Sequence, residues 1–206
     1  MFGIFATLGL FFLWIKFVIG RNNRKSERDR ALYWERERKA NEVRKQPLDN
    51  LAFLEIPFDL LPFGVLTDSD TQNDEAFIRT FTDKKVLNLT GVSNTDLKLK
   101  YGAANLPLLS QYDQNYTLLV RTMNTWAERL FKENYKDRAG VILEYLVQTG
   151  ADTSITYLLL TKVYLDRKDY ESAERLRLLV TESSFTLKNS ILREIDLLIS
   201  KESSQP

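Results

Sequence analysis

The hydrophobic and polar positions change pattern three times along the chain, and each change predicts a different kind of structure. Residues 1–20 are almost continuously apolar, with Lys16 as their only charged side chain. Residues 21–46 are highly charged, and residues 47–66 are densely apolar but interrupted by prolines. From residue 110 onward, apolar side chains recur at helical intervals. This pattern predicts an all-α protein, with an N-terminal transmembrane helix followed by an α-hairpin domain that carries a proline-punctuated extended arm.

Residues 1–20 are long enough to be a membrane anchor. At about 1.5 Å per residue, a helix of this length crosses the roughly 30 Å hydrocarbon core of a bilayer. Lys16 can extend its ammonium group to the lipid headgroups, and Trp14 also lies toward that interface. A cleaved signal peptide needs a basic region before the apolar run and a small-x-small site after it, and neither is found. We therefore expect an uncleaved, single-pass anchor.

The flanking charges predict the orientation of the anchor. No basic residue precedes the apolar run, whereas residues 21–46 contain ten Lys or Arg against five Asp or Glu, a net charge of +5. We therefore expect the N-terminus outside the cell membrane and the remaining domain in the cytoplasm. Anionic lipid attracts basic side chains near its surface by about 1 kcal/mol each, so the basic segment is expected to contact lipid. Acidic residues are interleaved with the basic ones, so nucleic acid is not expected as a partner. The residues expected at lipid headgroups are Lys16, Arg21, Arg24 and Lys25.

Residues 21–46 are predicted to form a basic juxtamembrane helix. The segment contains no Gly or Pro, and its acidic and basic side chains stand three to four residues apart, which supports a solvated helix. Its large apolar side chains are too sparse for a sustained heptad, so a dimerising coiled coil is the less favoured alternative. They are Leu32, Tyr33, Trp34 and Val43.

Residues 47–66 cannot form one continuous helix, because Pro47, Pro57 and Pro62 interrupt them. We predict an extended arm with short turns. Burial of each large apolar side chain contributes roughly 1.5 to 3 kcal/mol, so we expect the arm to pack into the core of the helical domain. The alternative is a docking strip for a partner or the membrane surface. The apolar side chains are Leu51, Phe53, Leu54, Ile56, Phe58, Leu60, Leu61 and Phe63.

Residues 67–109 are expected to contain short helices and a capped loop. Residues 67–74 are polar and are predicted to form a loop, and the apolar spacing of residues 75–89 predicts one or two short helices.

The run that follows has the pattern of a capped helix. Ser93 and Asp96 have capping-box spacing, which predicts a helix over residues 95–101 that ends at Gly102. Free N–H groups and hydroxyls at such a helix start can also hold an anion, although caps of this kind commonly satisfy only backbone groups. The candidate anion-binding residues are Thr90, Ser93, Asn94 and Lys98.

An internal period of 34 residues appears over residues 110–200. Ala139 aligns with Ala173, and each unit consists of a helix, a short polar turn and a second helix. Ser110 followed by Asp113 has capping-box form and predicts the start of this region. The predicted turns are residues 134–137, residues 167–169 and the separator at Gly150. Residues 187–200 are expected to form a last amphipathic helix that closes the stack, and residues 201–206 a tail.

Over roughly residues 119–186, this pattern resembles the tetratricopeptide repeat family, whose 34-residue units are helical hairpins. Lys136 and Arg177 stand where that family usually has aromatic residues, and Phe185 where it has proline. A generic helical bundle is the alternative. The matching residues are Met123, Trp126, Ala127, Leu130 and Ala139 in the first unit, and Tyr157, Leu160, Thr161, Tyr164, Tyr170 and Ala173 in the second.

In that family the inner face of the first helices binds partners, so the resemblance implies a partner-binding face here. The lysine–asparagine arrangement with which some members hold a C-terminal carboxylate is not reproduced, so that ligand is not implied. The implied partner-binding residues are Arg121, Asn124, Glu128, Phe131, Lys132, Ile155, Leu158, Lys162 and Asp166. The chain is also similar to uncharacterised single-span proteins of anaerobic Gram-positive bacteria, through the run Ser93-Asn-Thr-Asp-Leu-Lys, and this implies no activity.

The residue types restrict the possible chemistry. The chain has no His and no Cys, which excludes Ser-His-Asp and Cys-His catalysis and imidazole or thiolate metal sites. We expect neither an enzyme nor a metal or cofactor. The favoured function is a membrane-tethered scaffold or adaptor that binds a protein or peptide on the cytoplasmic face. The alternatives are a small-anion or nucleotide sensor or enzyme using residues 90–100, and a structural subunit of a membrane complex.

Overall fold

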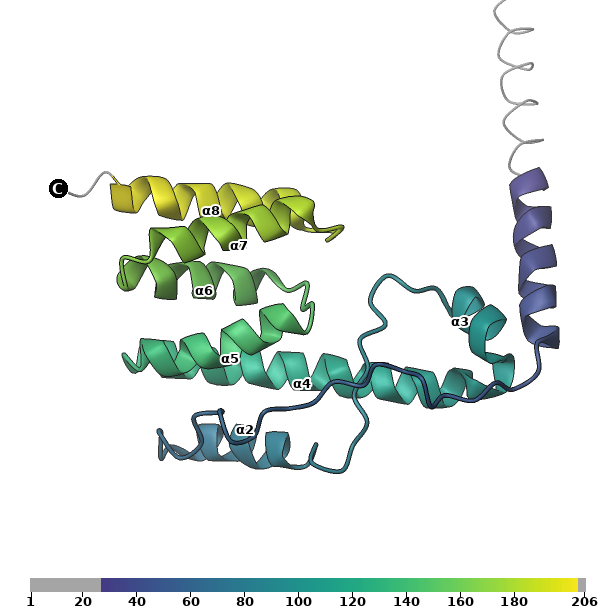
Figure 1. Cartoon of the computed structure of the whole chain (residues 1–206), viewed down its shortest axis with the longest axis horizontal. Helices are drawn as coiled ribbons and strands as arrows, with labels where there is room; N and C mark the ends of the chain where they lie inside the picture. The colour runs from purple at the N-terminus through teal and green to yellow at the C-terminus, as the bar shows by residue number, and fades with distance from the viewer. Residues whose placement is uncertain (1–26, 204–206) are drawn as a thin grey trace, which may run out of the picture. The chain divides into compact units, whose positions relative to one another are not determined.

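The computed structural model describes residues 27–203, and within this range the chain is helical and has no strand (Figure 1). The all-α expectation is therefore confirmed. The described residues form two compact units. The first contains residues 27–50 and Gly91–Leu108, and the second contains Leu51–Thr90 and residues 109–203.

The predicted anchor at residues 1–20 lies outside the described residues, as do the lipid-contact candidates Lys16, Arg21, Arg24 and Lys25. Between residues 27 and 203, no helix has both the length and the apolar character that crossing a bilayer requires.

The first unit contains the first described helix and the predicted capped helix. Residues 27–42 are helical, and they are followed in this unit by α3 (Asn94–Tyr101) and the short 3₁₀ helix η1 (Ala103–Asn105). Ser93 caps α3, because its hydroxyl oxygen accepts a hydrogen bond from the Asp96 backbone N–H over 3.2 Å. The predicted capping box is confirmed, and α3 begins one residue earlier than expected.

Two polar contacts hold the chain after the first helix against the end of α3. The backbone N–H of Gln46 donates to the carbonyl of Tyr101 over 3.0 Å, and the side-chain amide of Asn105 donates to the carbonyl of Gln46 over 2.7 Å. Gly102 lies between them at φ +86°, and a Cβ there would stand 2.5 Å from the Arg44 carbonyl oxygen. Only glycine fits this position without displacing the backbone.

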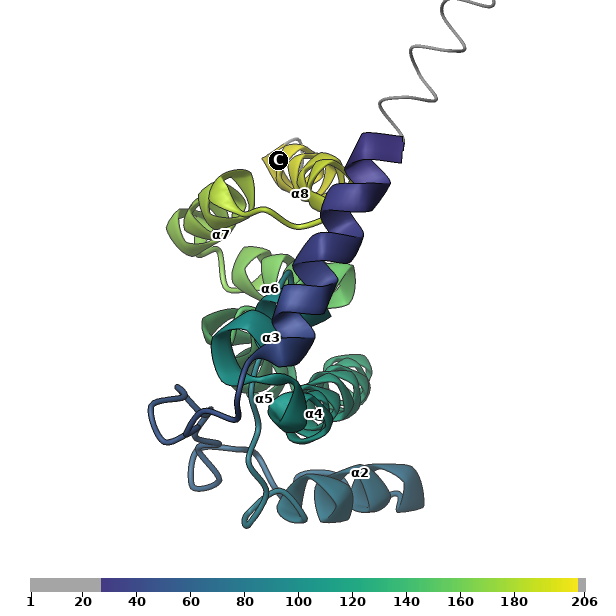
Figure 2. The same ribbon diagram turned by 90° about the vertical axis from the view of Figure 1, so that its right-hand side faces the viewer.

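The second unit is a stack of helices. In chain order they are α2 (Ser69–Arg79), α4 (Leu106–Lys132), α5 (Lys136–Gln148), α6 (Ser154–Asp166), α7 (Tyr170–Glu182) and α8 (Lys188–Ser203), and α4 belongs to this unit from Leu109 onward. α5 packs against α6, and α6 packs against α7 and α8, so that successive helices are layered in both views (Figures 1 and 2). The predicted turns are confirmed, since Asn134, Gly150 and Lys168 have positive φ between consecutive helices.

Two predicted helix starts are wrong. α2 begins at Ser69, within the predicted loop of residues 67–74, because the Asp68 carboxylate caps it by accepting a hydrogen bond from the Thr71 N–H over 2.9 Å. α4 begins at Leu106 and not at Ser110. Pro107 is compatible with this earlier start, since a first-turn proline lacks only an N–H that has no partner within the helix.

The arm packs against the helical core, as predicted. Leu61 is buried, and the Phe63 ring lies 5.1 Å from the ring of the fully buried Trp126, measured between centroids. The Tyr145 hydroxyl also donates to the backbone carbonyl of Glu55 over 3.2 Å. The arm therefore forms part of the core of the second unit. The partly buried arm side chains that pack against this core are Leu54, Ile56, Phe58, Phe63, Val65 and Leu66.

Candidate partner-binding groove

A groove of about 320 Å³ opens between α4 and the start of α6. Its size lies at the lower end of the range for ligand-binding cavities. α4 supplies one wall, and the loop between α5 and α6 supplies much of the other. The lining residues are Thr90, Tyr116, Thr117, Val120, Arg121, Asn124, Thr125, Glu128, Ala151, Asp152, Thr153 and Ile155.

Four of the nine residues predicted to bind a partner line this groove: Arg121, Asn124, Glu128 and Ile155. The other five do not line it. Phe131 and Lys132 follow on α4, and Leu158, Lys162 and Asp166 follow on α6.

Three of the five predicted residues outside the groove interact with charged side chains of this chain. Lys132 forms an ion pair with Glu128 over 2.9 Å, and Asp166 forms one with Lys136. The Lys136 ammonium also lies 5.7 Å from the Phe131 ring centroid.

Asn124 fixes the wall where α4 meets α6. Its side chain is only 5% exposed, and its amide nitrogen donates to the carbonyl of Val120 over 3.0 Å and to the hydroxyl of Thr153 over 3.1 Å. Its amide oxygen accepts from the Thr156 hydroxyl over 2.8 Å. A buried amide with this many partners holds one orientation, so Asn124 shapes the groove by holding its two sides together.

A second polar cluster supports the opposite end of the groove. The Asn88 amide donates to the Tyr116 hydroxyl over 3.1 Å and to the carbonyl of Thr149 over 2.9 Å. Tyr116 in turn donates to the same carbonyl over 3.2 Å. Burial raises the pKa of Tyr116, with a further contribution from the Asp152 carboxylate, so the phenol stays protonated at neutral pH and remains a donor.

The charged side chains of the groove differ in whether they have partners. Glu128 is paired with Lys132. Arg121 is exposed and Asp152 is half-buried, and neither forms an ion pair with any residue that the structure describes. The groove therefore presents one unpaired cation and one unpaired anion.

Sequence reasoning missed several groove residues. Thr117 lies one helical turn before Arg121, so the same α4 face could have been extended to include it. Ala151, Asp152 and Thr153 belong to the connection before α6, where no hydrophobic period marks which side chains face the groove. Thr90, predicted for anion binding, also lines the groove.

The other anion-binding candidates lie in the first unit, where an internal carboxylate occupies the donors. Lys98 pairs with Glu37, and the Thr95 hydroxyl donates to the same carboxylate over 2.7 Å. These bonds, first the one from Lys98, lower the pKa of Glu37. Ser93 is engaged with Asp96, and Asn94 is the first residue of α3. Binding of an external anion here stays a prediction.

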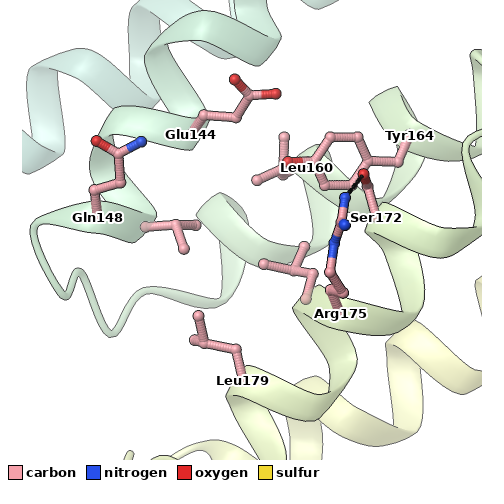
Figure 3. Close-up of a pocket in the computed structure, with 9 residues that line it drawn as sticks. Glu144, Gln148, Leu160, Tyr164, Ser172, Arg175 and Leu179 are labelled. Carbon is pink, nitrogen blue, oxygen red and sulfur yellow. Dashed lines mark hydrogen bonds between the residues drawn. The ribbon is translucent and has the colours of Figure 1, made fainter.

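A second pocket of about 320 Å³ lies between α5, α6 and α7 (Figure 3). Leu160 and Leu179 line it, with Glu144 on α5 and Arg175 on α7 at its rim (Figure 3). Arg175 bonds the Ser172 hydroxyl over 2.7 Å and the Glu171 carboxylate over 3.0 Å, so its guanidinium is already engaged within α7.

Among residues 27–203, no cluster of acidic side chains gathers that could hold a metal ion. Comparison of the chain with protein-family models, with curated proteins and with solved structures finds no match in any of the three.

Proposed function

We propose that this protein is a membrane-tethered interaction module. Residues 1–20 hold it at the cytoplasmic face of the cell membrane, and the groove between α4 and α6 binds an extended segment of a partner protein. The main support is that the groove contains four residues of the face expected to bind partners, namely Arg121, Asn124, Glu128 and Ile155.

The build of the groove suits a peptide. Val120, Ala151 and Ile155 provide apolar surface, and the hydroxyls of Thr117 and Thr125 retain acceptor capacity for peptide N–H groups. Both walls are held by buried hydrogen bonds, so binding costs little reorganisation of the protein.

The helix spacing agrees with the proposed tetratricopeptide-like hairpins. α5 begins at Lys136 and α7 begins at Tyr170, which places the second helices of the two hairpins 34 residues apart. The fully buried Ala139 and Ala173 sit at equivalent positions of these helices, where small side chains permit close helix approach. In this arrangement the first helices, α4 and α6, provide the binding face.

Site-specific photo-crosslinking in the source cells tests partner binding. A photoreactive amino acid is placed at Thr117, which lines the groove, or at the adjacent Leu118, which does not. We expect a discrete protein adduct from position 117 that is absent from position 118 and is lost when Ile155→Arg is added. Identical adducts from both positions would contradict the proposal.

The tether is tested separately, by extraction and protease protection. We expect the full chain to stay with membranes at alkaline pH and to resist protease added to right-side-out vesicles. In inverted vesicles, protease is expected to digest the domain. Release from the membrane at alkaline pH, or digestion in right-side-out vesicles, would contradict the proposed anchor or its orientation.

A further inference from the structure

We infer that the groove between α4 and α6 selects a partner segment in which an apolar residue lies between an acidic residue and a basic residue. This inference rests on the proposed function and specifies the class of peptide that binds. The acidic side chain pairs with Arg121, the basic side chain pairs with Asp152, and the apolar side chain lies on Val120, Ala151 and Ile155.

The first support is that these two charges lack partners. Elsewhere in the second unit, basic residues that lie near a carboxylate form ion pairs, as Arg129 does with Asp74 and Arg167 with Asp137. Glu128 in the groove itself is paired with Lys132 over 2.9 Å. Among the charged residues that line the groove, Arg121 and Asp152 thus remain for a partner to neutralise.

The environment of Asp152 strengthens this support. Its residue is half-buried, and its carboxylate is close enough to Tyr116 and Tyr157 to contribute to the raised pKa values of both phenols, which burial raises most. A carboxylate that is partly removed from water and has no ion-pair partner gains more from a new donor than a fully solvated one does. A basic side chain of the partner supplies that donor.

The two charges also lie on different walls. Arg121 is on α4, and Asp152 is in the connection that leads into α6. A chain that crosses the groove can meet both, because it passes from the α4 wall to the wall formed by the connection into α6. Val120 and Ala151 line the groove but are only 5% and 1% exposed, so Ile155, which is 37% exposed, is the most accessible of these three apolar side chains.

Because the groove carries one unpaired positive and one unpaired negative side chain, it does not suit a ligand whose charges all have the same sign. A phosphate-rich ligand or a nucleic acid needs several unpaired cations, and among residues 27–203 Arg121 is the only basic residue that lines the groove. A polycation would bring like charge toward Arg121. A segment with one charge of each sign satisfies both groups.

Selection from a random phage-displayed peptide library tests the inference. The full chain is held in lipid nanodiscs, and we expect the enriched peptides to contain an apolar residue flanked by one acidic and one basic residue. In the double variant Arg121→Glu, Asp152→Lys, we expect the order of the two charges along the enriched peptides to reverse. Arg138→Glu, a charge reversal at an exposed α5 residue away from the groove, should leave the selected pattern unchanged.

Affinity measurements on the most enriched peptide complete the test. We expect about tenfold weaker binding for Arg121→Glu and for Asp152→Asn, equivalent to about 1.4 kcal/mol each. Thermal unfolding followed by circular dichroism should show that both variants remain folded. Asp83→Asn serves as the matched control, since Asp83 is exposed and does not line the groove.

The possible outcomes separate the two proposals. Enriched peptides without a charge preference would overturn the inference and leave the proposed function standing. Failure to enrich any peptide above the groove-blocked variant Thr117→Trp would overturn both. The companion variant Leu118→Trp places the same side chain beside the groove and should behave like the parent chain.

Discussion

The Thr156 hydroxyl donates a hydrogen bond to the amide oxygen of Asn124 over 2.8 Å and so ties α6 to α4 beside the groove. Asn124 also bonds Val120 and Thr153, which satisfies both ends of its amide. Because the residue is buried, its replacement by alanine removes three hydrogen bonds and leaves Thr153 and Thr156 bonded only to each other at this site.

We therefore predict that Asn124→Ala lowers the free energy of unfolding by about 1 to 3 kcal/mol. Chemical denaturation of the full chain in nanodiscs measures this. Gln114→Ala removes another amide from α4, but one that is exposed, and should change the stability by less than about 0.5 kcal/mol. Equal effects of the two substitutions would show that the buried network contributes nothing.

Gly102 and Gly91 provide a matched pair for the first unit. Both have positive φ, at +86° and +81°, but a Cβ at Gly102 would meet the Arg44 carbonyl, whereas a Cβ at Gly91 has no atom within 4 Å. We predict that Gly91→Ala costs about 1 to 2 kcal/mol for its backbone conformation alone. Gly102→Ala should cost clearly more, since overpacking adds about 1 to 3 kcal/mol.

Hydrogen exchange reads out the local effect of these substitutions. We expect Gly102→Ala to increase exchange at the Gln46 N–H, which bonds Tyr101, and Gly91→Ala to leave that amide protected. Similar exchange in both variants would contradict the close approach of Arg44 to Gly102.

The bond between Glu37 and Lys98 predicts a pH dependence. Hydrogen bonds from Lys98 and then Thr95 lower the pKa of Glu37 below its usual value of 4.5, so the ionised form is favoured in the folded unit. This contribution is fully present above the unfolded pKa and is lost as pH falls through the lower folded value.

We expect amide exchange in residues 27–42 to increase at acidic pH in the parent chain. Glu37→Gln should increase amide exchange in these residues at neutral pH and make the exchange less dependent on pH. Glu35→Gln is the control, because Glu35 pairs with Lys39 inside the same helix. If Glu37→Gln retained the full acid response, another carboxylate would be responsible.

The arm offers a fourth prediction. Phe63 packs on Trp126 and carries the Arg79 guanidinium 3.9 Å from its ring centroid, whereas Leu60 is 69% exposed. We predict that Phe63→Ala lowers the free energy of unfolding by about 2 to 3 kcal/mol and that Leu60→Ala changes it by less than about 0.5 kcal/mol. Thermal or denaturant unfolding compares the two variants. A change of less than about 0.5 kcal/mol in the free energy of unfolding for Phe63→Ala would contradict the assignment of the arm to the core.

Local signals made the helices and turns of the second unit predictable. Trp126 and Leu130 recur at helical spacing, and both are fully buried. Gly150 carries the positive φ that its position between two helices suggested. These helices and turns depend on residues that are close together in the sequence, so the amino-acid sequence alone is enough to predict them.

The missed features depend on contacts between distant residues or on weak caps. Lys98 has basic character that suits an external anion, but its partner Glu37 stands 61 residues away and no local pattern links them. Asp152 faces the groove because α5 and α6 pack together, and the start of α2 depends on a single carboxylate at Asp68. Sequence periodicity identified a face, and helix packing determined which part of it opens.

The contacts among Gln46, Tyr101 and Asn105 also determine how mechanical tension would travel. A pull applied at residue 27 reaches Gln46 and is shared there with the backbone of Tyr101 and the Asn105 amide, before it can extend the arm of residues 47–66. From Asn105 the chain continues directly into α4. Tension that arrives from the N-terminal side is therefore divided at Gln46 between the arm and the segment that leads into α4, and the full load falls on the arm only after the hydrogen bonds of Gln46 break.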